Sequence, residues 1–305
     1  MKILVATQKP FAPAAVKQMK ELIKQAGYEL ILLEKYENQQ DLTDAVIDVD
    51  ALIVRSDKVT PEVLQKAQNL KVVVRAGAGY DNIDLDAASQ KNVVVMNTPG
   101  QNSNAVAELV LGMLVYMARN RFNGTAGTEL KGKILGIHAY GNVGKNVARI
   151  AKGFDMQVVA HDPYVSSEIV ERDGIKDFEQ AEDMYKYAQY ISLHIPATKQ
   201  TIKSINYDLL KNMPPNAVLI NTARKEVIDE DGLLKLMSER PDFTYISDIA
   251  PDKKDEFETR YANRVFFTPK KMGAQTAEAN INAGVAAVNQ IVNFFKTGDI
   301  RFKVN

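Results

Sequence analysis

The sequence predicts an α/β protein with two domains, each built on a doubly wound parallel sheet. Short β-branched runs alternate with helical patterns in two successive series. Strands separated by helices need crossover connections, which produce a parallel sheet covered on both faces. A chain of 305 residues also exceeds the size at which one hydrophobic core usually keeps growing. The two series therefore indicate two domains rather than one.

The first series of expected strands covers residues 3–6, 30–33, 51–54, 72–74 and 93–96, with helices expected at 13–25 and 61–68. The second series covers 134–139, 157–161, 190–194, 217–221, 245–249 and 265–267. Apolar residues at helical spacing predict a linking helix over 102–119 and a last helix over 275–295 that can return to the first domain. We therefore expect one domain from residues 1–98 and 275–305 and a second from 99–274.

Composition and charge exclude several classes of protein. The 38 basic residues balance 38 acidic ones, so no bulk basic excess indicates a nucleic-acid partner. The longest apolar stretch, 109–118, contains Gly112 and is well short of the roughly 20 residues that a membrane span needs. The chain has no cysteine, which excludes disulfides, thiolate catalysis and cysteine metal sites. We expect a soluble, cytoplasmic protein without a metal centre.

The sharpest local motif is a strand, a turn and a helix in the middle of the chain. The turn reads Ala139-Tyr140-Gly141-Asn142-Val143-Gly144 and precedes an expected helix over 145–152. A dinucleotide site needs such a tight glycine turn, because backbone N–H groups at the helix amino terminus must approach the pyrophosphate. The motif favours a Rossmann-like domain; a turn that merely packs a helix on a strand is the alternative.

Asp162 and Ala139 refine this prediction. Asp162 follows the next strand, 18 residues after Gly144, where a carboxylate accepts hydrogen bonds from the adenosine ribose and repels a 2′-phosphate. The expected cofactor is therefore NAD rather than NADP. Ala139 stands where such turns usually have their first glycine, and its β-carbon could narrow the turn or shift the pyrophosphate.

Five further stretches follow a recognisable order along the chain. They are Leu52-Ile-Val-Arg55-Ser56, Arg75-Ala-Gly77-Ala-Gly79-Tyr-Asp81-Asn82-Ile-Asp84, Met96-Asn-Thr-Pro99, residues 102–108 with their Ala-Glu-Leu, and Ile220-Asn-Thr-Ala-Arg224. With the glycine turn, they make most of the chain resemble the D-isomer-specific 2-hydroxyacid dehydrogenases. The resemblance implies an NAD-dependent oxidoreductase, expected to be a homodimer, with the active site in the cleft between two Rossmann-like domains.

The resemblance also implies roles for matching positions. Arg224 would hold the substrate carboxylate and the reacting carbonyl, because a guanidinium offers two parallel donors; a surface arginine in an ion pair is the alternative. Asp248 would face the nicotinamide side, with a turn or helix-capping aspartate as the alternative. The positions expected at the cofactor are Tyr140, Gly141, Asn142, Val143, Gly144, Asp162, His194, Pro196, Thr222, Ala223, Asp248 and Gly273.

The substrate is expected to carry two anionic ends. The resemblance implies that backbone N–H groups of the loop Ala76-Gly77-Ala78-Gly79 bind the substrate carboxylate. Arg55 matches the family position associated with a phosphate, and Arg75 lies beside the loop. The remaining positions expected at the substrate are Ser56, Asn102 and Ser103.

The chain departs from the family at the proton donor. Family members carry a histidine two residues before the glycine of a His-x-Gly motif, whereas this chain reads Thr268-Pro-Lys270-Lys271-Met-Gly273. Lys271 takes the histidine position, and Lys270 is the fallback if the loop aligns one residue differently. An amine can donate the proton in reduction or remove it in oxidation. The alternative is two solvated lysines in an inactive relative.

Other positions also differ from the family pattern. The glutamate that supports the family histidine is replaced near Lys253, and Lys225 stands where glycine usually follows the catalytic arginine. The region 119–127 is shorter than its equivalent, which normally helps to build the dimer contact. The chain's histidines, all expected to be structural rather than catalytic, are His138, His161 and His194.

These observations favour the NAD-dependent oxidation of 3-phosphoglycerate to 3-phosphohydroxypyruvate and the reverse, which is the first step of phosphorylated serine biosynthesis. The nearest alternative is a hydroxypyruvate or glyoxylate reductase, or another D-2-hydroxyacid dehydrogenase. A non-catalytic, NAD-sensing corepressor is the alternative from another class. Because no further domain follows the last expected helix, we expect no serine feedback through an appended regulatory domain.

Overall fold

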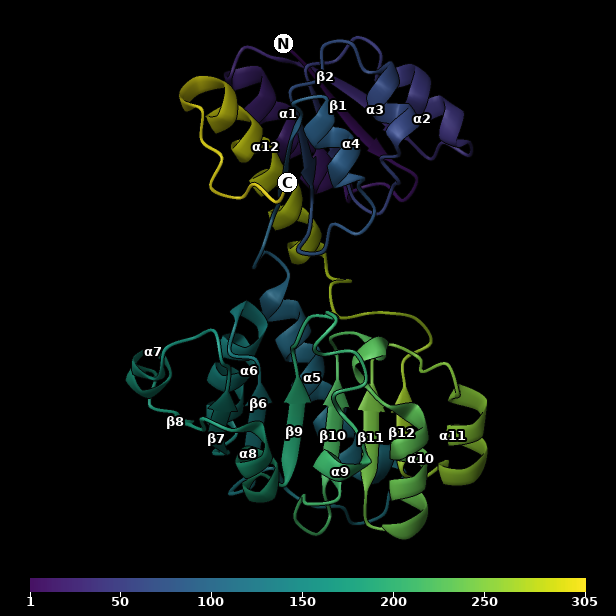
Figure 1. Ribbon diagram of the computed structural model, residues 1–305, viewed down its shortest axis with the longest axis vertical. Helices are drawn as coiled ribbons and strands as arrows, with labels where there is room; N and C mark the ends of the chain where they lie inside the picture. The colour runs from purple at the N-terminus through teal and green to yellow at the C-terminus, as the bar shows by residue number, and fades with distance from the viewer. The chain divides into compact units, whose positions relative to one another are not determined.

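The computed structural model describes residues 1–305 and divides them into two compact units (Figure 1). Unit 1 contains Met1–Asn102 and Gln275–Asn305, and unit 2 contains Ser103–Ala274. The sequence places the corresponding limits after residue 98 and before residue 275. Each unit has its own parallel sheet with helices on both faces, so the predicted fold class is confirmed.

Unit 1 is built on five parallel strands in the order β2-β1-β3-β4-β5. Strand β1 pairs on both sides, with Ile3 opposite Leu30 in β2 and opposite Ala51 in β3. Residues of β1, β3 and β4 are almost all apolar and buried, as both faces of a helix-covered parallel sheet require. The strands are β1 (Lys2–Thr7), β2 (Glu29–Glu34), β3 (Ala51–Val54), β4 (Val72–Arg75) and β5 (Val94–Asn97).

The helices of unit 1 form a layer on each face of its sheet (Figure 1). The first and last helices of the chain pack side by side on one face, so the C-terminal helix belongs to the first unit, as the sequence suggests. The helices on this face are α1 (Pro13–Gln25) and α12 (Ala277–Thr297). Those on the other face are α2 (Gln39–Ala45), α3 (Pro61–Lys66) and α4 (Leu85–Gln90).

Unit 2 is built on seven parallel strands in the order β12-β11-β10-β9-β6-β7-β8. The chain order reverses between β9 and β6, and parallel sheets of this kind bind ligands at the carboxyl ends of the strands beside such a reversal. The strands are β6 (Ile134–His138), β7 (Gln157–His161), β8 (Lys176–Asp177), β9 (Tyr190–Leu193), β10 (Val218–Asn221), β11 (Thr244–Ser247) and β12 (Val265–Phe267).

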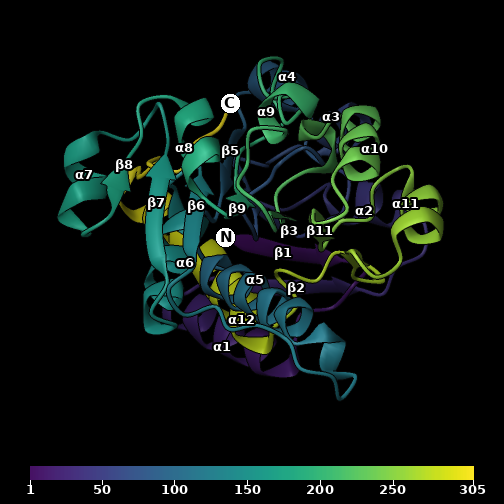
Figure 2. The ribbon, with the colours of Figure 1, turned by 90° about the horizontal axis from the view of Figure 1, so that it is seen from below.

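Two helical layers also cover the sheet of unit 2. Helices α5 and α6 pack against each other, and α7 lies beside β8 at the sheet edge (Figure 2). One layer contains α5 (Ser103–Ala118), α6 (Asn142–Gly153) and α7 (Ser167–Arg172). The other contains α8 (Ala181–Tyr187), α9 (Tyr207–Leu210), α10 (Glu230–Glu239) and α11 (Lys254–Tyr261). Two short 3-10 helices are η1 (Asn120–Phe122) and η2 (Lys225–Val227).

Several element limits differ from the sequence-based prediction. The expected strand 134–139 ends at His138, because Ala139 adopts a φ of 81° that a strand does not tolerate. The following helix begins at Asn142 rather than at residue 145, so part of the predicted turn is its first turn. Strand β8 is not predicted, because two residues carry no periodic pattern. No helix combines the length and the apolar character that crossing a membrane requires.

Candidate active site

The glycine turn of unit 2 leaves the amino terminus of α6 without a side-chain cap. Gly141 is the residue before the helix, and no side chain accepts a hydrogen bond from the first-turn N–H groups. Gly141 and Asn142 are exposed, so these N–H groups can be reached from outside. An uncapped helix amino terminus carries unsatisfied donors and the positive end of the helix dipole, which together suit a phosphate group.

Gly144 lets α6 approach β6 closely. A β-carbon added at this position would lie 2.4 Å from the carbonyl oxygen of Ala139 and 2.9 Å from Cγ2 of Ile137. Ala139 itself has a φ of 81°, in the left-handed region that favours glycine. The turn therefore retains the close helix–strand contact despite the alanine, at the cost of backbone strain at Ala139.

Asp162 lies directly after β7, as predicted, and already accepts two backbone hydrogen bonds. Its Oδ2 accepts from the N–H of Tyr140 at 2.8 Å, and its Oδ1 accepts from the N–H of Tyr164 at 2.9 Å. A carboxylate has about four acceptor sites, so hydrogen bonds from ribose hydroxyls remain feasible. The N–H of Tyr140 already donates to Asp162, so the backbone donors still available at the turn are those of the residues after Tyr140. The ring of Tyr140 is buried.

A second group of predicted residues comes together at the carboxyl ends of β10, β11 and β12, which are neighbours in the sheet. The guanidinium of Arg224 donates to the carbonyl oxygen of Ala223 at 3.0 Å. The Nζ of Lys271, from the loop after β12, donates to the same oxygen at 3.4 Å. The two cations that the sequence assigns to catalysis therefore lie within a few ångströms of one atom. Lys270 is exposed, and no hydrogen bond from its amine is found.

Asp248 is the carboxylate of this cluster. It is fully buried, and its Oδ2 accepts from the N–H of Gly273 at 2.8 Å, while its Oδ1 has no hydrogen-bond partner. Burial raises the pKa of Asp248, and the Gly273 N–H, Lys271 and Arg224 oppose that rise. Asp248 thus also has the structural role that the sequence leaves open as an alternative, because it holds the 268–273 loop. Its free Oδ1 also leaves an acceptor for a bound group.

The buried hydroxyl of Thr222 provides another unpaired polar atom nearby. Its Oγ1 has no hydrogen-bond partner although the residue is buried. Buried polar groups in native proteins are nearly always satisfied, so this hydroxyl is available for a hydrogen bond to a bound ligand or water. The uncapped α6 terminus, Asp162 and the unpaired atoms of Thr222 and Asp248 fit a dinucleotide with its pyrophosphate at the turn.

The three histidines lie at the ends of the adjacent strands β9, β6 and β7. The ring of His138 is 5.5 Å from that of His161, and its Nδ1 lies 3.0 Å from the hydroxyl of Tyr185. The Nε2 of His194 lies 3.0 Å from the hydroxyl of Ser192. Burial lowers the pKa of His138 to about 4 and that of His194 to about 3, and a neighbouring imidazole adds to each shift. The side chain of His194, predicted at the cofactor, is thus held by Ser192, and Pro196 beyond it is exposed.

In unit 1, the loop after β4 offers fewer donors than the sequence predicts. The N–H of Ala76 continues the sheet by donating to Val54, and the N–H of Gly77 closes a tight turn onto Arg75. The predicted role of these two N–H groups is therefore corrected, because both are used inside the unit. The N–H groups of Ala78 and Gly79 are the remaining candidates for the substrate carboxylate. The positive φ of Gly77 and its missing side chain leave space for the guanidinium of Arg75.

Arg55 is held in place by groups from two ends of the chain. Its guanidinium donates to the carbonyl oxygens of Lys9 at 3.1 Å and Pro10 at 3.2 Å, and to Oδ1 of Asn280 in α12. Nδ2 of Asn280 in turn donates to the carbonyl oxygen of Thr276 at 2.7 Å, which fixes its Oδ1 toward Arg55. Asn280 is not predicted from the sequence, because no motif links residues 225 positions apart.

The remaining substrate positions differ in exposure. Ser56 is exposed, Asn102 is half-buried at the end of unit 1, and Ser103 is buried at the start of α5 in unit 2. Near the departures from the family pattern, Lys225 pairs with Asp252 and Lys253 pairs with Asp231. Asp252, which lies next to the position of the missing glutamate, is thus engaged by Lys225. Asp248 interacts electrostatically with Lys271.

Comparisons with known proteins identify the family to which the chain belongs. Residues 107–270 match the family model described as D-isomer specific 2-hydroxyacid dehydrogenase, NAD binding domain. The chain is 36% identical over 270 residues to a D-3-phosphoglycerate dehydrogenase of Methanocaldococcus jannaschii, covering 83% of this chain and 51% of that protein. It is 33% identical over 281 residues to a hydroxypyruvate reductase of Thermotoga maritima, covering 86% and 90% of the two chains.

A solved structure is similar over the whole chain. It is the NAD⁺-bound 3-phosphoglycerate dehydrogenase of Entamoeba histolytica, which is 46% identical with a TM-score of 0.90. The match covers 100% of this chain and 98% of that chain. By contrast, the chain spans about half the length of several curated phosphoglycerate dehydrogenases that it matches. The match to the family model and these relatives establish that the chain belongs to the D-isomer-specific 2-hydroxyacid dehydrogenase family and carries its NAD-binding domain.

Proposed function

We propose that this protein oxidises D-3-phosphoglycerate at carbon 2 to 3-phosphohydroxypyruvate with NAD⁺, and catalyses the reverse reduction. The observation that carries the proposal is the convergence of Arg224 and Lys271 on one carbonyl oxygen, beside the buried carboxylate of Asp248. The relatives named as phosphoglycerate dehydrogenases support the choice of substrate.

Each residue of the cluster has a distinct chemical task. Arg224 binds the substrate carboxylate and the oxygen on carbon 2 through its parallel N–H donors. Lys271, as the neutral amine, removes the proton of the carbon-2 hydroxyl while the carbonyl forms, and as the ammonium it returns that proton in reduction. Asp248 stabilises the ammonium form electrostatically. Gly141, Asn142, Val143, Gly144 and Asp162 would hold NAD⁺, which when bound would supply the acceptor for the hydride from carbon 2.

The residues of unit 1 bind the two anionic ends of the substrate. The N–H groups of Ala78 and Gly79 are proposed for the carboxylate, and Arg55 with Arg75 for the phosphate. Arg55 still has unused N–H groups after its bonds to Lys9, Pro10 and Asn280, because a guanidinium has five. A substrate without a phosphate would make no use of Arg55.

Substitutions at the two adjacent lysines test the proton donor. Lys271→Met should lower kcat by about 10²–10⁴ while NADH affinity stays near the wild-type value, because general acid–base catalysis contributes that factor. Lys270→Met is the matched control and should retain turnover. The opposite pattern moves the role to Lys270, and wild-type turnover in both variants eliminates an amine donor. Arg224→Lys should raise KM and lower kcat, because the two parallel donors are lost.

A hydroxypyruvate or glyoxylate reductase is the second candidate, favoured by the Thermotoga maritima relative, which the chain matches over most of its length. Comparing kcat/KM for 3-phosphohydroxypyruvate and hydroxypyruvate separates the two functions. Preference for the unphosphorylated acid would favour the reductase. NADH binding without turnover of either acid would favour a non-catalytic, NAD-sensing protein.

The proposal also includes a cytoplasmic homodimer. The support for a dimer is an aromatic group in unit 2: Phe122 is 66% exposed and packs edge-on against Tyr116, which in turn contacts Phe266. An exposed aromatic group of this kind is often covered by a partner. Light scattering of the purified protein tests the dimer, and Phe122→Ser should weaken it. The cytoplasmic location fits a phosphorylated substrate and is tested by cell fractionation.

A further inference from the structure

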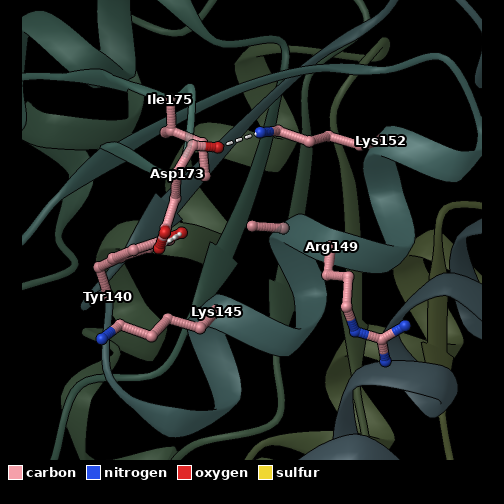
Figure 3. A pocket seen from close by; sticks show the side chains of 7 residues that line it. Tyr140, Lys145, Arg149, Lys152, Asp173 and Ile175 are labelled. Carbon is pink, nitrogen blue, oxygen red and sulfur yellow. Dashed lines mark hydrogen bonds between the residues drawn. The ribbon is translucent and has the colours of Figure 1, made fainter. Parts of the chain in front are cut away.

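A pocket with a volume of about 340 Å³ lies between α6 and the residues Tyr140, Asp173 and Ile175 in unit 2 (Figure 3). Its floor is apolar and includes the buried side chains of Ala148 and Ile175. The ring of Tyr140 forms part of the wall. None of the residues assigned to catalysis lines it, and Tyr140 is the one residue that it shares with the glycine turn.

Three cationic residues are among those that line this pocket. Lys145, Arg149 and Lys152 all come from α6, at spacings of four and three residues that place them on one helix face (Figure 3). All three are exposed. The twelve residues of α6 include no Asp or Glu that could neutralise these charges. We call these three residues the α6 basic stripe.

The contacts of the α6 basic stripe leave its charge without a carboxylate partner. Arg149 donates to the side-chain amide oxygen of Asn104 at 2.7 Å, and Lys152 donates to the main-chain carbonyl of Asp173. The ammonium of Lys145 lies 5.8 Å from the ring centre of Tyr140. Other lysines of the chain do form ion pairs at close range, such as Lys211 with Asp208 at 2.6 Å.

The one carboxylate at the pocket does not neutralise the α6 basic stripe. Asp173 accepts a hydrogen bond from the hydroxyl of Tyr140 at 3.0 Å through Oδ2. Burial raises the pKa of Tyr140, and Asp173 adds to the rise, so this hydroxyl stays a donor at neutral pH. The pocket therefore combines three positive charges with one negative charge over an apolar floor. An excess of positive charge at a concave surface favours the binding of an anionic ligand.

We infer that this pocket binds a small anion with two or more negative charges, at a site separate from the substrate and the dinucleotide. Phosphorylated metabolites and polycarboxylates share the required chemistry. Lys145 and Lys152, whose side chains extend toward Tyr140 and Asp173 (Figure 3), contact the charged groups, and the floor of Ala148 and Ile175 packs against the remainder of the ligand. The inference does not depend on the proposed substrate, because it involves other residues.

Calorimetric titration of the full chain with inorganic pyrophosphate, at about 0.01 M salt, tests the inference. Saturating NADH is included, so that the glycine turn is occupied and cannot take the pyrophosphate. The wild type should bind one pyrophosphate at this pocket under these conditions, apart from any bound by Arg55 and Arg75 at the proposed substrate site. The triple variant Lys145→Met, Arg149→Met and Lys152→Met should bind at least about tenfold more weakly, which corresponds to about 1.4 kcal/mol. A parallel titration with citrate decides between phosphorylated and carboxylic ligands.

A charge-matched control is available on α1 of unit 1. Lys17, Lys20 and Lys24 lie on this helix, and their triple Met variant removes the same charge far from the pocket in sequence. It should bind pyrophosphate like the wild type. The single variant Lys145→Met gives a second readout if the α6 triple variant does not fold, and it should weaken binding about threefold or more.

Three results would overturn the inference. They are no pyrophosphate or citrate binding by the NADH-saturated wild type, equal binding by the wild type and the α6 variants, and an equal loss in the α1 control. Loss of NADH affinity in the α6 triple variant would also overturn it, because the α6 basic stripe would then belong to the dinucleotide site.

Discussion

The two glycines of the α6 turn are expected to have separable roles. A β-carbon at Gly144 would lie 2.4 Å from the carbonyl oxygen of Ala139, whereas one at Gly141 would have no atom within 4 Å. Gly144 is thus required by the contact between α6 and β6. Gly141, with a φ of −81°, tolerates a side chain and faces the space where a pyrophosphate would bind.

The magnitude follows from this geometry. Gly144→Ala must move the helix from 2.4 Å to the 3.4 Å at which ordinary contacts begin, a displacement of about 1 Å. Overpacking of this kind costs about 1–3 kcal/mol, which lowers Tm by roughly 2–12 °C for a unit of this size. Gly141→Ala should change the free energy of unfolding by less than about 1 kcal/mol, the usual range for such caps. Both variants should bind NADH at least about tenfold more weakly.

Calorimetric melting and NADH fluorescence titration of the two single variants measure both quantities. The expected result is a lower Tm in Gly144→Ala alone and weaker NADH binding in both. An unchanged Tm in Gly144→Ala would refute the argument from the helix–strand contact. Wild-type NADH affinity in Gly141→Ala would refute the placement of the pyrophosphate at this helix terminus.

Three further predictions concern the strained residue Ala139, the buried histidines and the contact between Asn280 and Arg55. Ala139→Gly should raise the stability of unit 2 by up to about 1 kcal/mol, because it relieves the strain of the φ of 81°, and a Tm several degrees lower in thermal melts would contradict this. Because burial lowers the pKa of His138 to about 4 and of His194 to about 3, the unfolded chain binds their protons first as the pH falls below 6.5. The contribution of the two histidines to the free energy of unfolding should be nearly complete above about pH 7 and fall by about 2 kcal/mol per histidine between about pH 7 and 5 in urea titrations, a loss that His194→Gln should reduce. Asn280→Ala should raise KM for 3-phosphoglycerate about threefold to tenfold, with little change in kcat or in KM for NAD⁺, because Arg55 loses its charge-assisted partner; equal kinetics in wild type and variant would exclude this positioning role.

Most of the fold can be predicted from the sequence, because helices and strands follow from patterns of apolar residues that are close together in the chain. The strands 51–54, 157–161 and 265–267 and the helix 13–25 have the predicted limits, since apolar periodicity and residues such as Pro13 mark them within a few positions. The turn limits were less accurate. Whether Ala139 ends a strand or begins a turn depends on its φ angle. An alanine in the sequence does not indicate a positive φ, whereas a glycine would.

The candidate site was predicted as a set of residues but not as a geometry. Arg224 and Lys271 were named from motifs, whereas their shared contact with Ala223 required that β10, β11 and β12 lie side by side. The donors of the loop 76–79 were overestimated, because a backbone N–H has no sequence signature that tells whether the sheet already uses it. The same holds for the N–H of Tyr140, which donates to Asp162.

The sequence by itself determined the α/β class, the NAD-binding turn and the family, because each rests on residues that are close together in the chain. The tertiary structure decided which distant groups meet: Asp248 with Gly273, Arg55 with Asn280, and the α6 basic stripe with the Tyr140–Asp173 pair. The physical reason is that strand order and helix packing fix these distances. Both are set by burial of apolar surface over the whole unit, which no short stretch of sequence encodes.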